Sequence, residues 1–126
     1  MHQVYDSLEN YLEAIYVLRM ESDKVLSVDL AKDLDLSRAS VSNAVKKMRD
    51  KGYVIMEKGG NLVLTEEGER IGKEINERHQ TVKKILIHLG LDEELADHDA
   101  CRIEHALSQE TFDAIKKFLD KNTKVE

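Results

Sequence analysis

The apolar positions near the N-terminus recur at helical spacing. Leu12 and Ile15 belong to one apolar stripe, which predicts an amphipathic helix over residues 7–20. Asp6 is followed three positions later by Glu9, a pattern typical of the capping box at the first turn of a helix. We therefore expect the first helix to begin directly after Asp6.

Two further segments predict a pair of helices joined by a tight turn. Residues 25–27 are long enough only for an edge strand, and residues 28–34 then predict a helix of two turns. A longer helix is predicted to begin at Ser37, whose hydroxyl oxygen would accept hydrogen bonds from first-turn amides, and to end near Gly52. This order is the helix-turn-helix layout. The buried stripe of the longer helix would consist of Val41, Val45 and Met48.

Two short β segments follow the helix pair. Residues 53–58 and 62–64 read as strands, and they flank the turn sequence Gly59-Gly60-Asn61. A hairpin in this place is the wing of a winged helix, so the first half of the chain predicts a winged helix-turn-helix.

The second half of the chain is predicted to be helical throughout. A long helix follows the hairpin, another runs from Asp92 to Leu107, and Ser108 caps the last one. The expected fold is therefore mostly α. It comprises an N-terminal winged helix-turn-helix domain with a small β-hairpin wing over residues 1–64, and a helical C-terminal domain over residues 65–126.

Composition supports a helical protein without disulfide bonds. Proline is absent, only 5% of the residues are aromatic, and Cys101 is the single cysteine. No apolar stretch approaches the length of a membrane span, and the first residues lack the order of a signal peptide. We therefore expect a cytoplasmic protein with no membrane partner.

The charge excludes a protein that coats nucleic acid by bulk attraction, because the net charge is −6. In a winged helix, however, the second helix of the pair enters the major groove, and the cations that flank it meet phosphates. Asn43 is suited to adenine and Arg38 to guanine or a phosphate. The side chains predicted to face DNA are Ser37, Arg38, Ala39, Ser40, Ser42, Asn43, Lys46 and Lys47 on the helix, with Lys58 and Asn61 in the wing.

One winged helix reads only a few base pairs, so a specific double-stranded operator implies a homodimer that reads two half-sites. The last helix carries Phe112, Ile115 and Phe118, which would form either a dimer surface or an intrachain core.

The residues with the most metal-binding chemistry lie between 97 and 105. On a helix, Cys101, Glu104 and His105 converge on one face, with Asp97 and His98 one turn earlier. Thiolate, carboxylate and imidazole together suit Fe(II), Co(II), Zn(II) or Mn(II) better than Ca(II). The inward stripe of the long helix adds His79. Each of these residues alone is more often structural, so a hydrogen-bonded core is the alternative interpretation.

The order of these motifs resembles the bacterial metal-dependent repressors related to the diphtheria toxin repressor and the manganese transport regulators. The matching segments are residues 9–16, 36–42, 62–65 with Gly68, 78–79 and 100–108. The resemblance implies a homodimer that represses transcription by binding a palindromic operator when Fe(II) or Mn(II) is bound. It implies the ligands Asn10, Glu13, His79, Cys101, Glu104 and His105.

Two positions depart from the pattern of that family, and a third bears on which of its branches the chain is similar to. Asn10 offers only a neutral carbonyl oxygen, and Lys83 stands where the iron branch has a glutamate at a second site. Cys101 is similar to the iron branch, and because thiolate is a poor partner for Mn(II), it favours Fe(II). Zn(II), Co(II) and Ni(II) are expected to substitute in vitro.

Two other functions are compatible with part of this pattern. A winged-helix regulator could sense an organic ligand or the oxidation of Cys101 without any metal. A small metalloenzyme could use Glu and His to activate water, but no motif of a substrate cleft is recognisable, so we do not expect an enzyme.

Overall fold

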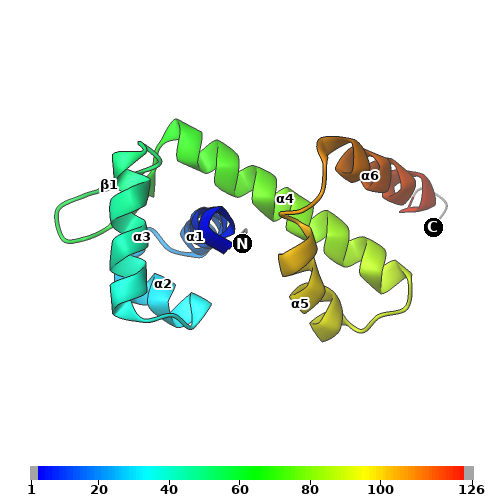
Figure 1. The fold of residues 1–126 in the computed structure, drawn as a ribbon, viewed down its shortest axis with the longest axis horizontal. Coiled ribbons are helices and arrows are strands. Elements are labelled where there is room, and N and C mark those ends of the chain that lie inside the picture. Colours follow the sequence, from blue (N-terminus) through cyan, green and yellow to red (C-terminus); the bar gives the residue numbers. More distant parts are fainter. Residues whose placement is uncertain (1–2, 124–126) are drawn as a thin grey trace. The chain divides into compact units, whose positions relative to one another are not determined.

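The computed structural model describes residues 3–123, which form six helices and one two-stranded sheet (Figure 1). These described residues divide after Glu74 into two compact units, and α4 contributes to both. The predicted fold, a winged helix-turn-helix followed by a helical domain, is confirmed. The elements are α1 (Gln3–Glu21), α2 (Ser27–Leu34), α3 (Arg38–Asp50), β1 (Val54–Met56), β2 (Leu62–Leu64), α4 (Glu66–His88), α5 (Glu93–Ile103) and α6 (Gln109–Thr123).

An apolar core lies beneath the helix-turn-helix in the N-terminal unit. Leu12 and Ile15 of α1, Leu30 of α2, Met48 of α3 and Leu62 of β2 are all at most 1% exposed. Burial of side chains of this size removes most of their apolar surface from water and stabilises the unit. The stripe predicted for α3 is the buried face of that helix, as Val41 is 0% and Val45 is 3% exposed.

The turn between α2 and α3 follows from local chemistry. Asp35 ends α2 in the left-handed conformation, with φ 55°. The Ser37 hydroxyl oxygen then accepts a hydrogen bond from the Ser40 amide at 3.1 Å, so the predicted cap of α3 is confirmed. The left-handed Asp35 and the Ser37 cap together fix the end of α2 and the start of α3.

The wing is an antiparallel hairpin in which Val54 pairs with Leu64. Its turn uses the conformational freedom of two glycines, because Gly59 and Gly60 have φ values of 88° and 89°. The prediction of an edge strand over residues 25–27 is wrong, since no strand forms there. One backbone hydrogen bond, from Leu62 N to Val25 O at 2.8 Å, nevertheless joins this segment to the wing.

Two predicted helix boundaries are wrong. The first helix begins at Gln3, so Asp6 and Glu9 lie within it and not at its start. No glycine or proline stands upstream to stop the helix from extending. The helix that begins after Asp92 ends at Ile103 and does not reach Leu107.

The C-terminal unit contains α5, α6 and the second part of α4. Ala96 and Ala100 of α5 are 0% exposed, and Val82 of α4 is 1% exposed. The predicted caps form here too: Asp92 accepts a hydrogen bond from Leu95 N at 2.8 Å, and Ser108 Oγ accepts one from Thr111 N at 3.1 Å. Among the described residues, no helix has the length and apolar character needed to cross a membrane.

Candidate metal centre and DNA-reading surface

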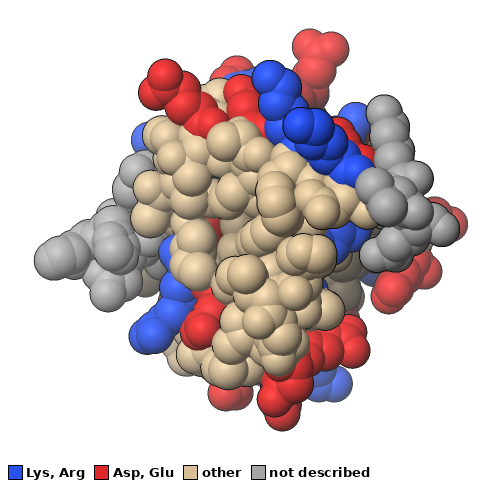
Figure 2. Space-filling model, turned by 90° about the vertical axis from the view of Figure 1, so that its right-hand side faces the viewer, with Lys and Arg blue, Asp and Glu red and all other residues tan. Residues whose placement is uncertain are grey.

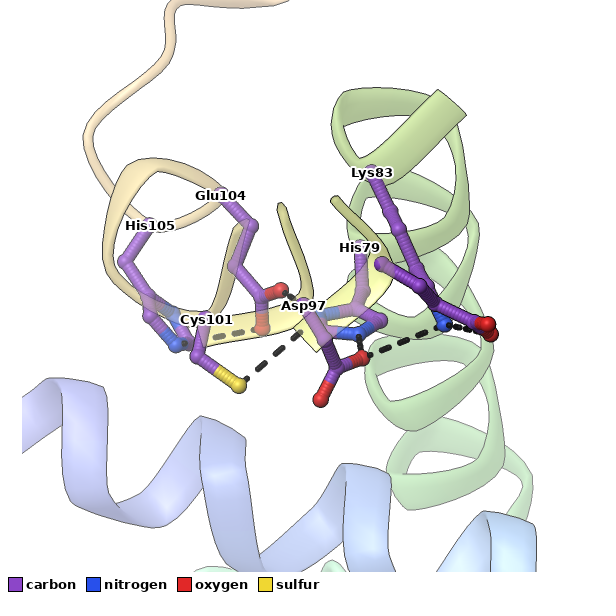
Figure 3. Close-up of polar contacts among 7 residues, drawn as sticks. His79, Lys83, Asp97, Cys101, Glu104 and His105 are labelled. Atoms are coloured by element: carbon purple, nitrogen blue, oxygen red, sulfur yellow. Dashed lines mark hydrogen bonds and ion pairs between the residues drawn. The ribbon is translucent and has the colours of Figure 1, made fainter. Parts of the chain in front are cut away.

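His79 and Glu104 are buried titratable residues of the C-terminal unit. His79 is 8% exposed and Glu104 is 0% exposed, and they come from α4 and from the residue that caps α5. His79 Nδ1 lies 2.7 Å from Glu104 Oε1. Figure 3 draws this contact as a dashed line. Buried ionisable groups are retained only where partners offset their desolvation. The pair is therefore the first sign of a functional site.

The other ring nitrogen of His79 faces a second carboxylate. His79 Nε2 lies 2.8 Å from Asp97 Oδ1 on α5. The Lys83 ammonium lies 3.5 Å from the same Asp97 oxygen and 3.4 Å from Glu93 Oε2. His79 is thus held between Glu104 on one side and Asp97 on the other.

Cys101 and His105 complete the group of potential ligands. The Cys101 sulfur lies 3.9 Å from His79 Nδ1, and His105 Nε2 lies 3.4 Å from Glu104 Oε2. The side chain of His105 is only 4% exposed. Figure 3 shows these side chains beside Glu104. The structure therefore brings together four of the predicted ligands within one unit: His79, Cys101, Glu104 and His105.

The hydrogen-bond partners of His79 favour its protonated form. The hydrogen bonds that it makes with Cys101 and then with Glu104 and Asp97 raise the pKa of His79 to about 11, although burial opposes the shift. The hydrogen bond from His79 also lowers the pKa of the Asp97 carboxyl. At neutral pH, a proton on His79 therefore supplies the positive charge that these acidic groups require.

One buried atom of the site lacks a hydrogen-bond partner among the described residues. Glu104 Oε2 is buried and accepts no hydrogen bond from any residue that the structure describes. The 3.4 Å approach of His105 is close enough for charge attraction but does not form a hydrogen bond. A buried carboxylate oxygen with spare lone pairs, beside two imidazoles and a thiol, is the donor set of a divalent transition ion. The residues present therefore fit such an ion.

One candidate from the sequence, His98, does not belong to this group. His98 points away from it, because its side chain is 70% exposed and pairs with Asp99 at 3.5 Å. The helix face that His98 was expected to share with Cys101 belongs to Asp97. Asn10 and Glu13 are half-buried residues of α1 in the N-terminal unit, and their role as ligands stays a prediction.

Arg78 is a residue that the chemistry of the sequence did not indicate. It makes three hydrogen bonds around the turn that carries Glu104. Its place directly before His79, on the same helix, was the available signal.

The predicted DNA-reading residues of α3 form an exposed surface. Arg38, Ser42 and Asn43 are exposed, as are Ser37, Ala39, Ser40, Lys46 and Lys47, and so is Lys58 in the wing. A groove lies between α3 and β1, and Lys46, Arg49 and Ile55 are among the residues that line it. The unit therefore presents a row of hydrogen-bond donors and cations of the kind that enters a major groove.

Asn61 has a structural role in the wing. Its Oδ1 accepts hydrogen bonds from Val25 N at 2.9 Å and from Arg19 Nη1 at 3.3 Å, and its Nδ2 donates to Glu57 Oε1 at 2.9 Å. These bonds occupy the amide, so the phosphate contact predicted for Asn61 would compete with the packing of the wing.

The C-terminal unit exposes apolar side chains. Figure 2 shows a broad area without charged residues, bordered by acidic and basic ones. Phe112 is buried and belongs to the intrachain core, whereas Phe118 is 45% exposed. A shallow groove beside Phe118 is lined by Ile85, Ala114 and Ile115. The other large apolar side chains exposed in this unit are Ile87, Leu89, Leu95 and Ile103.

Comparison with known proteins assigns both halves of the chain to one class. Residues 3–62 match the domain described as "Iron dependent repressor, N-terminal DNA binding domain". Residues 65–125 match "Iron dependent repressor, metal binding and dimerisation domain". The chain therefore belongs to the iron-dependent repressor family, whose members are metal-dependent transcriptional regulators, and the resemblance inferred from the motifs is confirmed.

Individual relatives agree with this assignment. The chain is 40% identical over 117 residues to an uncharacterised HTH-type transcriptional regulator of Methanocaldococcus jannaschii, a match that covers 91% of this chain and 94% of the relative. It is 37% identical over 111 residues to the transcriptional regulator MntR of Salmonella typhimurium, which covers 88% of this chain and 71% of the relative.

Solved structures share the fold. A manganese-dependent transcriptional repressor in complex with manganese superposes with a TM-score of 0.82 and 26% identity, covering 90% of this chain and 52% of that one. The metal-dependent transcriptional regulator MtsR superposes with a TM-score of 0.84 and 26% identity, covering 95% of this chain and 55% of that one. The chain thus spans about half the length of these solved relatives.

Proposed function

We propose that this chain is a cytoplasmic homodimer that binds a palindromic DNA operator and represses transcription when Fe(II) or Mn(II) occupies the centre beside Glu104. The observation that carries the proposal is the buried Oε2 atom of Glu104, which accepts no hydrogen bond from a described residue and belongs to a group with His79, Cys101 and His105. This donor set belongs to a chain whose other unit is a winged helix-turn-helix. A metal sensor needs both parts.

The chain's own residues would hold the ion in a defined way. Glu104 would offer Oε2, His105 an imidazole nitrogen and Cys101 its thiolate, while His79 would act as a ligand once it has lost its proton. When bound, the ion supplies positive charge to this acidic group. Following the family resemblance, Asn10 and Glu13 of α1 are proposed as the remaining ligands.

Ligands from both units would link metal binding to DNA binding. If an ion favours one arrangement of the DNA-reading unit over others, operator DNA must tighten metal binding by the same factor. The change in charge acts in the same direction, because clustered carboxylates repel phosphates until a cation neutralises them.

Cys101 is the residue that bears on metal identity. Thiolate ligands favour Fe(II), Co(II) and Zn(II) over Mn(II), which prefers oxygen and nitrogen. We therefore place Fe(II) ahead of Mn(II) as the physiological metal. Replacing Cys101 with an oxygen ligand, as in Cys101→Asp, should shift the preference towards Mn(II).

The homodimer is proposed from the apolar surface of the C-terminal unit. Ile115 and Phe118 of α6 border the groove described above, and exposed apolar side chains gathered in this way are typical of an interface between identical subunits. Two α3 helices presented by one dimer would read the two half-sites of a palindrome.

The test begins with selection of DNA from a random duplex library by the full chain, under anaerobic conditions with Fe(II). Affinity for the enriched duplex is then measured by fluorescence anisotropy with Fe(II), Mn(II), Zn(II) or a chelator. We expect a palindromic site that is bound at least tenfold more tightly with Fe(II) or Mn(II) than with chelator. Equal affinity in chelator would remove the metal switch, and an effect of peroxide in place of metal would favour the sensor of Cys101 oxidation.

A further inference from the structure

Arg78 lies beside His79 on α4 and makes contacts that the proposed function does not use. Its Nη1 atom donates to the backbone oxygen of Glu104 at 3.2 Å and to that of Leu107 at 2.7 Å. Its Nη2 atom donates to Gln109 Oε1 at 3.2 Å. The guanidinium therefore binds the turn after α5 at both of its ends and reaches the first residue of α6.

These contacts explain why α5 ends where it does. An extension of the helix to Leu107 would direct the carbonyl oxygens of this segment to amides further along the chain. Arg78 instead donates hydrogen bonds to two of these carbonyl oxygens. Ala106 N donates to Ile103 O at 2.9 Å, which closes a tight turn. Hydrogen bonds from α4 thus stabilise the turn that follows α5 and contains Glu104.

Glu104 is consequently fixed from three directions. Its backbone N donates to Ala100 O at 3.0 Å, its backbone oxygen accepts from Arg78, and its Oε1 lies 2.7 Å from His79 Nδ1. The remaining polar atom is Oε2, which no described residue hydrogen-bonds. The three contacts together select the carboxylate oxygen that is left for an ion.

Phe112 completes the surroundings of the guanidinium. The Arg78 Cζ atom lies 5.4 Å from the centroid of the Phe112 ring, and this ring is 6% exposed in the core of the C-terminal unit. A planar guanidinium can stack on a ring and donate to several acceptors at once, whereas a lysine ammonium is a point charge. The site is therefore built for arginine.

We propose that Arg78 is a positioning residue for the metal centre, which holds the turn over residues 104–107 so that Glu104 presents Oε2 to the ion. This inference rests on the proposed function, because it requires that a metal ion binds here. Arg78 does not itself act as a ligand, since a guanidinium has donors but no acceptor. Because the same side chain binds Gln109, it also ties the metal-binding turn to the start of α6.

The test uses Co(II) as the probe, with the full chain and the variant Arg78→Lys. Co(II) affinity is measured by competition with a fluorescent chelator, and the thiolate-to-cobalt absorption band reports the bond to Cys101. We expect Arg78→Lys to weaken Co(II) binding about 10- to 100-fold, the range typical of residues that support metal ligands. The band at saturating Co(II) should also shift, which a merely destabilised fold would not produce.

Arg70→Lys is the matched control. Arg70 lies on the same helix and pairs with Glu67 and Glu74, but all three side chains are more than half exposed. This variant should bind Co(II) with unchanged affinity and an unchanged spectrum. Equal affinity and equal spectra for Arg78→Lys and the parent chain would overturn the proposal, whereas failure of the parent chain to bind Co(II) would overturn the proposed function itself.

A second variant covers the case in which Arg78→Lys loses its helical circular dichroism in the metal-free state. Phe112→Leu removes the ring beneath the guanidinium but keeps an apolar side chain in the core. It should weaken Co(II) binding in the same direction by a smaller factor. Unchanged Co(II) affinity in Phe112→Leu would then contradict the role of Arg78.

Discussion

The two units of the chain fill their interiors with different chemistry. In the N-terminal unit, the cluster of buried residues that includes Leu30 and Met48 is apolar throughout. In the C-terminal unit, the buried side chains include His79 and Glu104. Burial of apolar side chains is favourable without any partner, whereas burial of a carboxylate costs free energy unless a charged or hydrogen-bonding partner offsets it. The comparison indicates that the first unit is built to keep one shape and the second to respond to a cation.

The largest effect that this contrast predicts is at Glu104. Glu104→Gln keeps the shape of the side chain and a hydrogen bond to His79 but removes the anionic oxygen from the site. We expect metal affinity to fall more than about 100-fold, beyond the range of a supporting residue, and metal-stimulated operator binding to disappear. Isothermal calorimetry with Mn(II) checks the first expectation and anisotropy the second.

The same variant should still fold, although loss of the charge that pairs with His79 should lower its stability. Helical circular dichroism of the metal-free variant that matches the parent chain, together with a lower unfolding midpoint in urea, would show this. Retention of tight metal binding by Glu104→Gln would contradict the contrast between the two units.

The opposite result is expected from Leu30, which is 0% exposed. Leu30→Ala leaves a cavity in the apolar core, and we expect it to lower the free energy of unfolding by about 2–5 kcal/mol. The affinity of the folded protein for metal should not change. Leu36→Ala is the matched control, since Leu36 is 44% exposed and its loss should alter stability by about 0.5 kcal/mol or less.

Asn43 separates base reading from phosphate contact within the N-terminal unit. Asn43→Ala should weaken binding to the selected operator by about 1–3 kcal/mol and leave random DNA almost unaffected. Lys58→Ala in the wing should instead weaken both to a similar extent and reduce the salt dependence of binding by about one ion. Anisotropy titrations over a range of salt concentrations distinguish the two patterns. A uniform loss in Asn43→Ala would mean that Asn43 contacts phosphate.

The smallest effect concerns the pH dependence of the metal-free protein. The pKa of His79 is raised from its ordinary value of 6.5 to about 11 in the folded state, chiefly through its hydrogen bonds to Cys101, Glu104 and Asp97. The resulting stabilisation is fully present below about pH 6.5 and is lost as the pH rises towards about 11.

The difference in unfolding free energy between the parent chain and His79→Gln, measured in chelator, should therefore shrink as the pH rises through this window. A difference that is constant with pH would show that His79 is not held in its charged form.

The sequence predicted the N-terminal unit well because its signals are local. The Ser37 cap, the stripe of α3 and the glycine turn of the wing each depend on residues a few positions apart, and each is present in the structure. The start of the first helix was missed, because an acidic residue followed by Glu9 occurs inside helices as well as at their ends.

The metal centre was predictable only in part. The convergence of Cys101, Glu104 and His105 followed from helical spacing, although Glu104 and His105 lie just beyond the end of α5. Asp97 and His98 are consecutive residues of α5, so their side chains point in different directions around the helix axis, and only Asp97 contacts His79. The buried alanines at 96 and 100 mark the inward face and would have favoured Asp97.

The contacts of Arg78 could not be predicted from spacing at all. Its partners lie 26 to 31 positions further along the chain, and two of the three are backbone oxygens, which any residue type possesses. Only the packing of α4 against the turn after α5 brings them together. Contacts between residues so far apart in the chain produce no periodic pattern in the sequence.

The central claim is that metal binding and operator binding are coupled, and one thermodynamic cycle tests it directly. The affinity for Fe(II) or Mn(II) is measured with and without the selected operator duplex, and operator affinity is measured with and without the same metal. The account predicts that both ratios exceed one and are equal, as linkage requires. Ratios of one, with metal and DNA bound independently, would contradict it.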